Sequence, residues 1–170
     1  MTEPGERGHV NSYQWLLRAL GTYLDEQPSC RISLVEVPGG FLVRFQRSLQ
    51  TLELEVYRFD SERLQEQLAI LFEQRKPATR ALHQGIWSAF PHGHANFFRA
   101  LGYELDQESA RTILIDELED GIVLTYLRPD NQGWRKRMVF LGLEDIEKIL
   151  GAALERRGAD LTAVPVSAQA

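Results

Sequence analysis

Cysteine, lysine and long hydrophobic runs are scarce in this sequence of 170 residues. The single cysteine, Cys30, cannot form a disulfide within the chain, which fits a reducing compartment. No apolar stretch approaches the roughly 18 residues that a membrane-spanning helix requires. The N-terminus is polar and acidic, unlike a secretory signal or a basic transit peptide. We therefore expect a cytoplasmic protein without membrane contact.

Positive charge is also in short supply, because 24 acidic residues outnumber 19 basic ones and leave a net charge of −5. Nucleic-acid binding depends on Lys and Arg side chains that neutralise phosphates, so this balance argues against it. The sequence lacks a phosphate-binding glycine loop, a nucleophile elbow and a two-histidine metalloprotease motif. We therefore expect neither an enzyme nor a bound cofactor.

The strongest positive feature is an internal repeat. Residues 18–25 return as residues 99–106 with six identities in eight positions, at an offset of 81 residues. The register continues without a gap to Gln46 and Leu127. Each copy of a duplicated unit presents a related surface on which the other can pack. The repeat therefore predicts two similar units that associate within one chain.

Hydrophobic periodicity predicts the same order of elements in both units. In the first unit the clearest strand alternates Leu52, Leu54 and Val56 with polar residues. The turns between strands are too short for parallel crossover connections, so each sheet should be an antiparallel meander. The first unit comprises a helix that begins near residue 12 and ends before Pro28, strands at 31–37, 41–46 and 52–57, and a helix from about 60 to 72. The second comprises a helix that buries Phe97, Phe98, Leu101 and Leu105, strands at 111–117, 121–128 and 134–141, and a helix that ends near Gly158.

The predicted fold is α+β, with two tandem α-β-β-β-α repeats packed as an intramolecular pseudo-dimer. Each repeat should form a three-stranded antiparallel meander with helices on one face. Gly21 and Gly102 occupy the same helical position, where glycine costs roughly 1 kcal/mol relative to alanine, so the first helices should make a close approach there. The expected segments are a flexible N-terminal tail (1–10), the first repeat (11–75), an ordered apolar linker (76–93), the second repeat (94–158) and a flexible C-terminal tail (159–170).

The two units differ on the sheet face turned away from the helices. In the first unit this face is mostly polar, whereas in the second it is mostly apolar. A contiguous apolar face is either buried inside the chain or exposed as an interface. We favour an interface with a protein partner or with a second copy of the chain. The predicted contact residues are Leu114, Val123, Leu127 and Val139.

An alternative site lies in the linker, where three of the four histidines fall within 12 residues. A groove there would offer imidazoles to a small ligand or a transition metal, in a sensory or an enzymatic role. The residues of this alternative site are His83, Trp87, His92 and His94. His94 also falls at the repeat position of Tyr13, on the buried stripe of its helix, where a core histidine is expected.

A further polar cluster is the turn from Asp116 to Asp120, which holds four carboxylates in five residues. Such a turn is either a solvated loop or a site for a hard divalent cation, which takes about six to eight oxygen ligands. The spaced ligands and the glycine of a calcium loop are missing. The solvated turn is the favoured interpretation.

The order α-β-β-β-α is similar to that of double-stranded RNA-binding domains, which read RNA with a glycine-proline-histidine loop and a lysine cluster. Here the loop reads Pro38-Gly39-Gly40 and the last helix opens with Asp60-Ser61-Glu62, which argues against RNA binding. The same order resembles the fold of type III secretion chaperones, which use sheet and helix surfaces to dimerise and to hold extended client segments. That resemblance implies a non-enzymatic protein-binding module, chaperone-like or regulatory, as the leading function.

Overall fold

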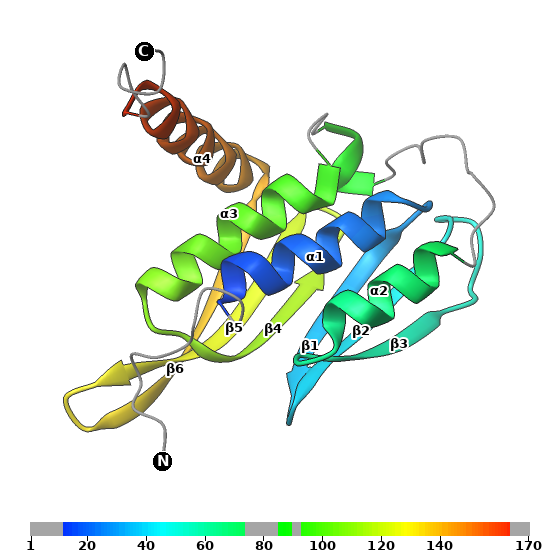
Figure 1. The fold of residues 1–170 in the computed structure, drawn as a ribbon, viewed down its shortest axis with the longest axis horizontal. Coiled ribbons are helices and arrows are strands. Elements are labelled where there is room, and N and C mark those ends of the chain that lie inside the picture. The colour runs from blue at the N-terminus through cyan, green and yellow to red at the C-terminus, as the bar shows by residue number, and fades with distance from the viewer. Residues whose placement is uncertain (1–11, 74–84, 90–92, 164–170) are drawn as a thin grey trace, which may run out of the picture.

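The computed structural model describes residues 12–73, 85–89 and 93–163, which form four α-helices, one 3-10 helix and a six-stranded sheet (Figure 1). The first half contains α1 (Tyr13–Asp25), β1 (Cys30–Val37), β2 (Gly40–Gln46), β3 (Glu55–Asp60) and α2 (Leu64–Glu73). The 3-10 helix η2 (Gly85–Ala89) follows. The second half contains α3 (Gly93–Gln107), β4 (Arg111–Glu117), β5 (Gly121–Asp130), β6 (Gly133–Gly142) and α4 (Leu143–Ala163). The predicted α+β class is confirmed.

All six strands form one antiparallel sheet in the order β3-β2-β1-β4-β5-β6. The expectation of two separate three-stranded sheets is therefore wrong. β1 pairs with β4, with Leu34 opposite Ile115, so the two halves join directly at the middle of the sheet. Each of these strands would otherwise present an edge of unpaired backbone N–H and C=O groups, and their pairing removes both edges.

Helices α1 and α3 lie side by side over one face of the sheet (Figure 1). They run in opposite directions and touch at two glycines. A Cβ atom added to Gly21 would lie 2.7 Å from the Cα atom of Ala95, and one added to Gly102 would lie 2.5 Å from the carbonyl oxygen of Tyr13. Neither distance leaves room for a side chain, which confirms the predicted close approach.

Each of these two helices is capped by an aspartate from the other. Asp106, near the end of α3, accepts hydrogen bonds of 3.0 Å from the backbone N–H groups of Tyr13 and the next residue of α1. Asp25, at the end of α1, accepts hydrogen bonds of 2.7 and 3.0 Å from the backbone N–H groups of His94 and the next residue of α3. The first N–H groups of a helix have no acceptor within it, and negative charge at this end is favourable. The caps therefore stabilise the helix pair as a unit.

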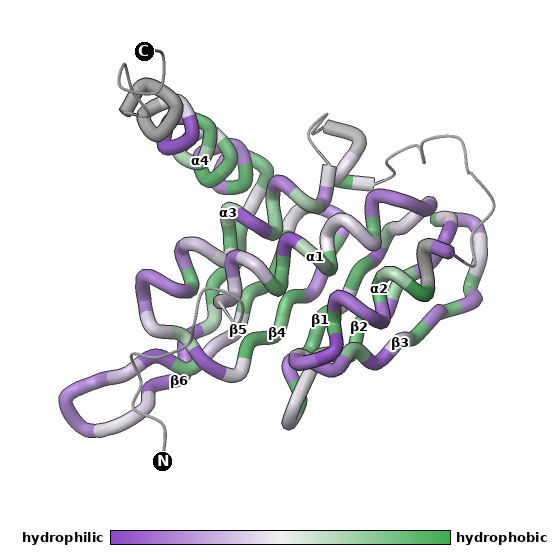
Figure 2. The backbone as a smooth tube through the Cα atoms, in the orientation of Figure 1, coloured by the Kyte–Doolittle hydropathy of each residue, from purple (hydrophilic) through white to green (hydrophobic). Residues whose placement is uncertain are grey.

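The core lies between the helices and the sheet, where the central strands are predominantly hydrophobic (Figure 2). In the first half it contains an aromatic cluster in which Tyr23 packs edge-on against Phe45, Tyr57 and Phe59. Ring pairs of this geometry are worth roughly 0.5–1.5 kcal/mol each beyond the area that they bury. The cluster fixes how β3 lies against β2.

The third strand consequently departs from its predicted pattern. The apolar residues that suggested it are exposed, by 89% for Leu52, 50% for Leu54 and 57% for Val56. Instead Tyr57 and Phe59 face the helices, because they pair with buried residues of β2. A shift of one residue moves every side chain of a strand to the other face, and burial of the large rings decides which face is inside.

The chain ends differently from the expectation as well. Helix α4 continues through Gly158 to Ala163, so the predicted end at Gly158 is wrong. A glycine stops a helix when it adopts a left-handed conformation, and Gly158 does not have the positive φ that this requires. Residues 1–11, 74–84, 90–92 and 164–170, which include most of the predicted tails and linker, lie outside the described residues.

Candidate functional site

The register of the sheet assigns each side chain to one of two faces, because directly paired residues of antiparallel strands point to the same side. Leu114, Val123 and Leu127 point to the face away from the helices, hereafter the outer face, and all three are partly exposed. Val139 instead pairs with the buried Leu124 and packs against the core. The predicted placement of Val139 on the outer face is therefore wrong, because the alternation along β6 is shifted by one residue.

Apolar residues from other strands extend this surface beyond the expected contacts. Leu42, Val35 and Leu114 are successive pairing partners and form a row across β2, β1 and β4. Met138 and Phe140 continue the outer face onto β6 and are 67% and 49% exposed. The first half thus contributes two aliphatic side chains to a surface that the sequence assigned to the second half. The whole set, named here the apolar patch, consists of Val35, Leu42, Leu114, Val123, Leu127, Met138 and Phe140.

A hollow of about 630 Å³ adjoins the apolar patch where β1 begins and β4 ends. Three polar residues, Ser33, Arg44 and Asp116, lie next to one another in it, because they are successive pairing partners across the strands. Apolar side chains from the β2–β3 connection, η2 and the β4–β5 turn surround them: Leu49, Leu54, Ile86 and Leu118. A few polar groups set among apolar ones are typical of binding pockets.

The β5–β6 hairpin extends beyond β4 at the other end of the sheet and concentrates positive charge (Figure 1). Arg128 and Arg135 pair directly across the two strands, although like charges in that position destabilise a hairpin. On the outer face of the hairpin, Arg111 and Lys136 flank Leu127 of the apolar patch in a single row. Arg128 and Arg135 point to the opposite face, because each is adjacent in its strand to one of the outward-pointing residues Leu127 and Lys136. The positive charge at this end of the outer face therefore comes from Arg111 and Lys136.

Only two of the four residues of the alternative histidine site belong to the described part of the chain. His83 and His92 lie outside the described residues. Trp87 and His94 do come together, with ring centres 4.4 Å apart, but each is only 1% exposed. Within the described residues no group of three His, Cys, Asp and Glu side chains is placed to hold a metal ion. Trp87 and His94 are therefore part of the core.

His94 also contacts the aspartate that caps its helix. Its Nδ1 atom lies 2.8 Å from Oδ1 of Asp25. Burial by itself raises the pKa of the Asp25 carboxyl, but the hydrogen bonds from the His94 ring and from two backbone N–H groups outweigh it and lower the pKa below its usual value. The charged form of Asp25 therefore stabilises the folded state. This stabilisation is lost as the pH falls through the pKa of the carboxyl in the folded protein.

Two glutamates connect the halves, a role that was not predicted for either of them. Glu36 of β1 accepts a hydrogen bond of 3.0 Å from the backbone N–H of Ile113, and Glu117 of β4 accepts one of 2.7 Å from Ile32. The N–H group of Ile32 lies where the register between β1 and β2 shifts, and that of Ile113 lies where the register between β4 and β5 shifts. The two glutamates are 81 residues apart, so their recurrence in the repeat was the available signal.

The predicted solvated turn holds for Glu119 and Asp120, which are exposed, but Glu117 ends β4 and is only partly exposed. Burial raises the pKa of its carboxyl to about 7, against the opposing effect of the hydrogen bond from Ile32. Cys30 is fully buried nearby, and burial together with the negative charge of Glu117 raises the pKa of its thiol. A buried, protonated thiol is a poor nucleophile.

Comparisons with known proteins leave the chain without an assigned relative: no family model, curated protein or solved structure matches it. None of the helices in the described part of the chain combines the length and hydrophobicity needed to cross a bilayer.

Proposed function

We propose that the protein is a non-enzymatic protein-binding module, chaperone-like or regulatory, that acts in the cytoplasm. Its outer face would hold a segment of a partner protein that combines apolar and acidic residues. The observation that carries this proposal is the apolar patch, which crosses five strands on the face opposite α1, α2 and α3. Contiguous exposed apolar surfaces of this kind are typical of interaction sites.

The charges beside the apolar patch support an acidic partner. Arg111 and Lys136 flank the apolar patch at Leu127, and both point to the outer face. Carboxylates on a bound segment would relieve the repulsion among these cations and would orient the segment on the sheet. The partner would therefore place its acidic residues at the hairpin end of the outer face.

The edge of the sheet supports an extended conformation for the partner. β6 is a strand of ten residues, and in the described part of the chain it pairs only with β5. A strand edge of this length can form backbone hydrogen bonds with an extended peptide, while alternate side chains of the peptide contact one face of the sheet. Met138 and Phe140 lie on β6 itself, where such a peptide would begin to cover the apolar patch.

We also propose that the two halves arose by duplication and associate as a pseudo-dimer within one chain. The contacts between them support this, because they connect matched positions in both directions. Asp25 and Asp106 cap opposite helices, and Glu36 and Glu117 each accept a backbone hydrogen bond from the other half. Such an association gives a single binding face to which both halves contribute.

The proposal is tested with two labelled model peptides that share their apolar residues and carry either Glu or Lys between them. Fluorescence anisotropy should detect binding of the Glu peptide and at least tenfold weaker binding of the Lys peptide. Val123→Lys should weaken binding of the Glu peptide by about tenfold or more while circular dichroism stays unchanged. Val56→Lys is the matched control, because Val56 also points outward but lies on β3, at the far end of the same row.

Three results would contradict the proposal. The first is equal binding of the two peptides. The second is an equal loss of binding in the Val123 and Val56 variants. The third is that Val123→Lys and Leu127→Lys both unfold the protein. The last result would assign these side chains to the core. Light scattering gives the apparent molar mass. If that mass rises with protein concentration and Val123→Lys abolishes the rise, the outer face binds a second copy of the chain instead of an acidic partner.

A further inference from the structure

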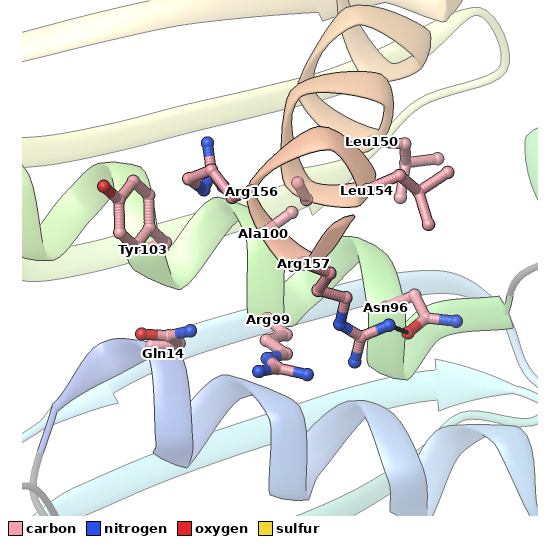
Figure 3. A pocket seen from close by; sticks show the side chains of 10 residues that line it. Gln14, Asn96, Arg99, Ala100, Tyr103, Leu150, Leu154, Arg156 and Arg157 are labelled. Carbon is pink, nitrogen blue, oxygen red and sulfur yellow. Dashed lines mark hydrogen bonds between the residues drawn. The ribbon is translucent and has the colours of Figure 1, made fainter. Parts of the chain in front are cut away.

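A separate cavity of about 210 Å³ lies between α3 and α4, on the helical side of the molecule (Figure 3). Residues of these two helices form most of its wall, and Gln14 at the beginning of α1 completes it. It is smaller than the roughly 300–1,000 Å³ of pockets that take drug-sized ligands. Its volume therefore suits a small molecule.

The polar part of the cavity is dominated by arginine. Arg99 comes from α3, and Arg156 and Arg157 come from α4. Figure 3 shows the guanidinium groups of Arg99 and Arg157 on the side of the cavity that faces α1. Among the described residues that line the cavity, none is acidic. Arg99 and Arg157 thus lie near each other on that side, whereas Arg156 lies beside Tyr103 (Figure 3).

Two of these arginines are held in position by neighbouring side chains of α3. The Arg157 Nη1 atom donates a hydrogen bond of 3.3 Å to Oδ1 of Asn96. The Arg156 guanidinium lies 3.8 Å from the centre of the Tyr103 ring, and its Nη1 atom is 3.5 Å from a carboxylate oxygen of Glu104. Stacking and pairing of this kind orient the planar donor groups before any ligand arrives, which lowers the entropic cost of binding.

The remainder of the cavity wall is apolar. Ala100 of α3 and three residues of α4 line it: Leu150, Ala153 and Leu154. A ligand that fills the cavity would therefore place a charged group among the arginines and a compact hydrocarbon part against the aliphatic side chains. Inorganic ions would use only the first of these surfaces.

We propose that this cavity binds a small organic anion. Its carboxylate or phosphate group accepts hydrogen bonds from Arg99 and Arg157, and its apolar part contacts Leu150 and Ala153. Guanidinium groups suit this task because their planar donors match the oxygens of both anions and their hydrogen bonds to anions are charge-assisted. The site is independent of the outer face, since it lies between two helices on the other side of the sheet.

Isothermal titration calorimetry with four probes tests the site: phenyl phosphate, benzoate, benzyl alcohol and inorganic phosphate. At least one of the two aromatic anions should bind about tenfold or more tightly than benzyl alcohol, because charge-assisted hydrogen bonds are strong. It should also bind more tightly than inorganic phosphate, which lacks the apolar part. The tighter of phenyl phosphate and benzoate identifies the preferred anionic group, and equal affinities mean that the arginines accept either.

Variants localise the effect. Arg157→Gln and Arg99→Gln should each weaken binding of the aromatic anion by about tenfold, and amide shifts in nuclear magnetic resonance spectra should map to α3 and α4. Arg63→Gln is the control, because Arg63 is an exposed arginine that pairs only weakly with Glu66 outside this site. Aromatic anions that bind no better than benzyl alcohol would overturn the proposal. An equal loss of binding in Arg63→Gln and in the cavity variants would also overturn it. These measurements do not depend on ligand binding at the outer face.

Discussion

The two halves of the molecule make the same contacts with each other in different surroundings. Asp25 and Asp106 cap opposite helices, but only Asp25 also contacts a buried imidazole, that of His94. Glu36 and Glu117 accept matched backbone hydrogen bonds, but Glu36 also accepts one of 2.5 Å from the Tyr13 hydroxyl. The shared contacts hold the halves together, and the differences around them show where each half has diverged.

The helix crossing is where a small change should have the largest effect. Gly102→Ala would place a Cβ atom 2.5 Å from the Tyr13 carbonyl oxygen, so α1 and α3 must move apart. We expect a loss of roughly 3 kcal/mol or more in the free energy of unfolding, measured by urea denaturation. Gly151→Ala is the control, since nothing lies within 4 Å of a Cβ atom there and helix propensity should give a small gain of about 0.5–1 kcal/mol. Similar effects of the two substitutions would contradict the close crossing.

The reciprocal caps should differ in strength. Asp106→Ala removes the acceptor for two N–H groups and should cost about 1 kcal/mol. Asp25→Ala removes the same two bonds and also the contact with the buried His94 ring, and should cost about 2 kcal/mol. Urea denaturation at pH 7 measures both. Equal losses would show that the His94 contact contributes nothing.

Glu117 and Glu36 should differ in how they make stability depend on pH. The pKa of Glu117 is about 7 in the folded protein against an ordinary value of 4.5, so between these pH values the folded state holds a proton that the unfolded chain has released. Stability should therefore fall as pH rises from about 4.5 to 7 and remain lower above that range. Glu117→Gln removes this partly buried charge and should raise the free energy of unfolding at pH 8.5 by roughly 1–2 kcal/mol, with little change at pH 4.5.

Glu36→Gln provides the comparison for this experiment. It weakens the acceptor for the Tyr13 hydroxyl and for the Ile113 backbone, so it should lower stability at pH 8.5. Urea denaturation of both variants at pH 4.5 and 8.5 separates the two sites. If the free energy of unfolding of Glu117→Gln changes with pH in the same way as that of the unaltered protein, the pKa of Glu117 is not raised by burial.

The sequence predicted most elements and much of the core because local periodicity governs them. The buried stripes of α1 and α3 were correct, including His94, and so was the reason for the two repeated glycines. It failed at β3 and at Val139, where both faces of a strand carry apolar residues and alternation does not indicate which is inside. The cavity arginines also escaped notice, because they come from two helices whose contact no local pattern reveals.

The amino-acid sequence by itself determined the order of helices and strands and the recurrence of the same contact residues after 81 positions, since both are properties of the linear pattern. Only the tertiary structure decided that β1 and β4 pair to form a single sheet, which side of each strand faces outward, and that Glu117 is partly buried. These outcomes depend on contacts between residues far apart in the chain. Such contacts follow from which edges and surfaces must be covered once the elements have formed.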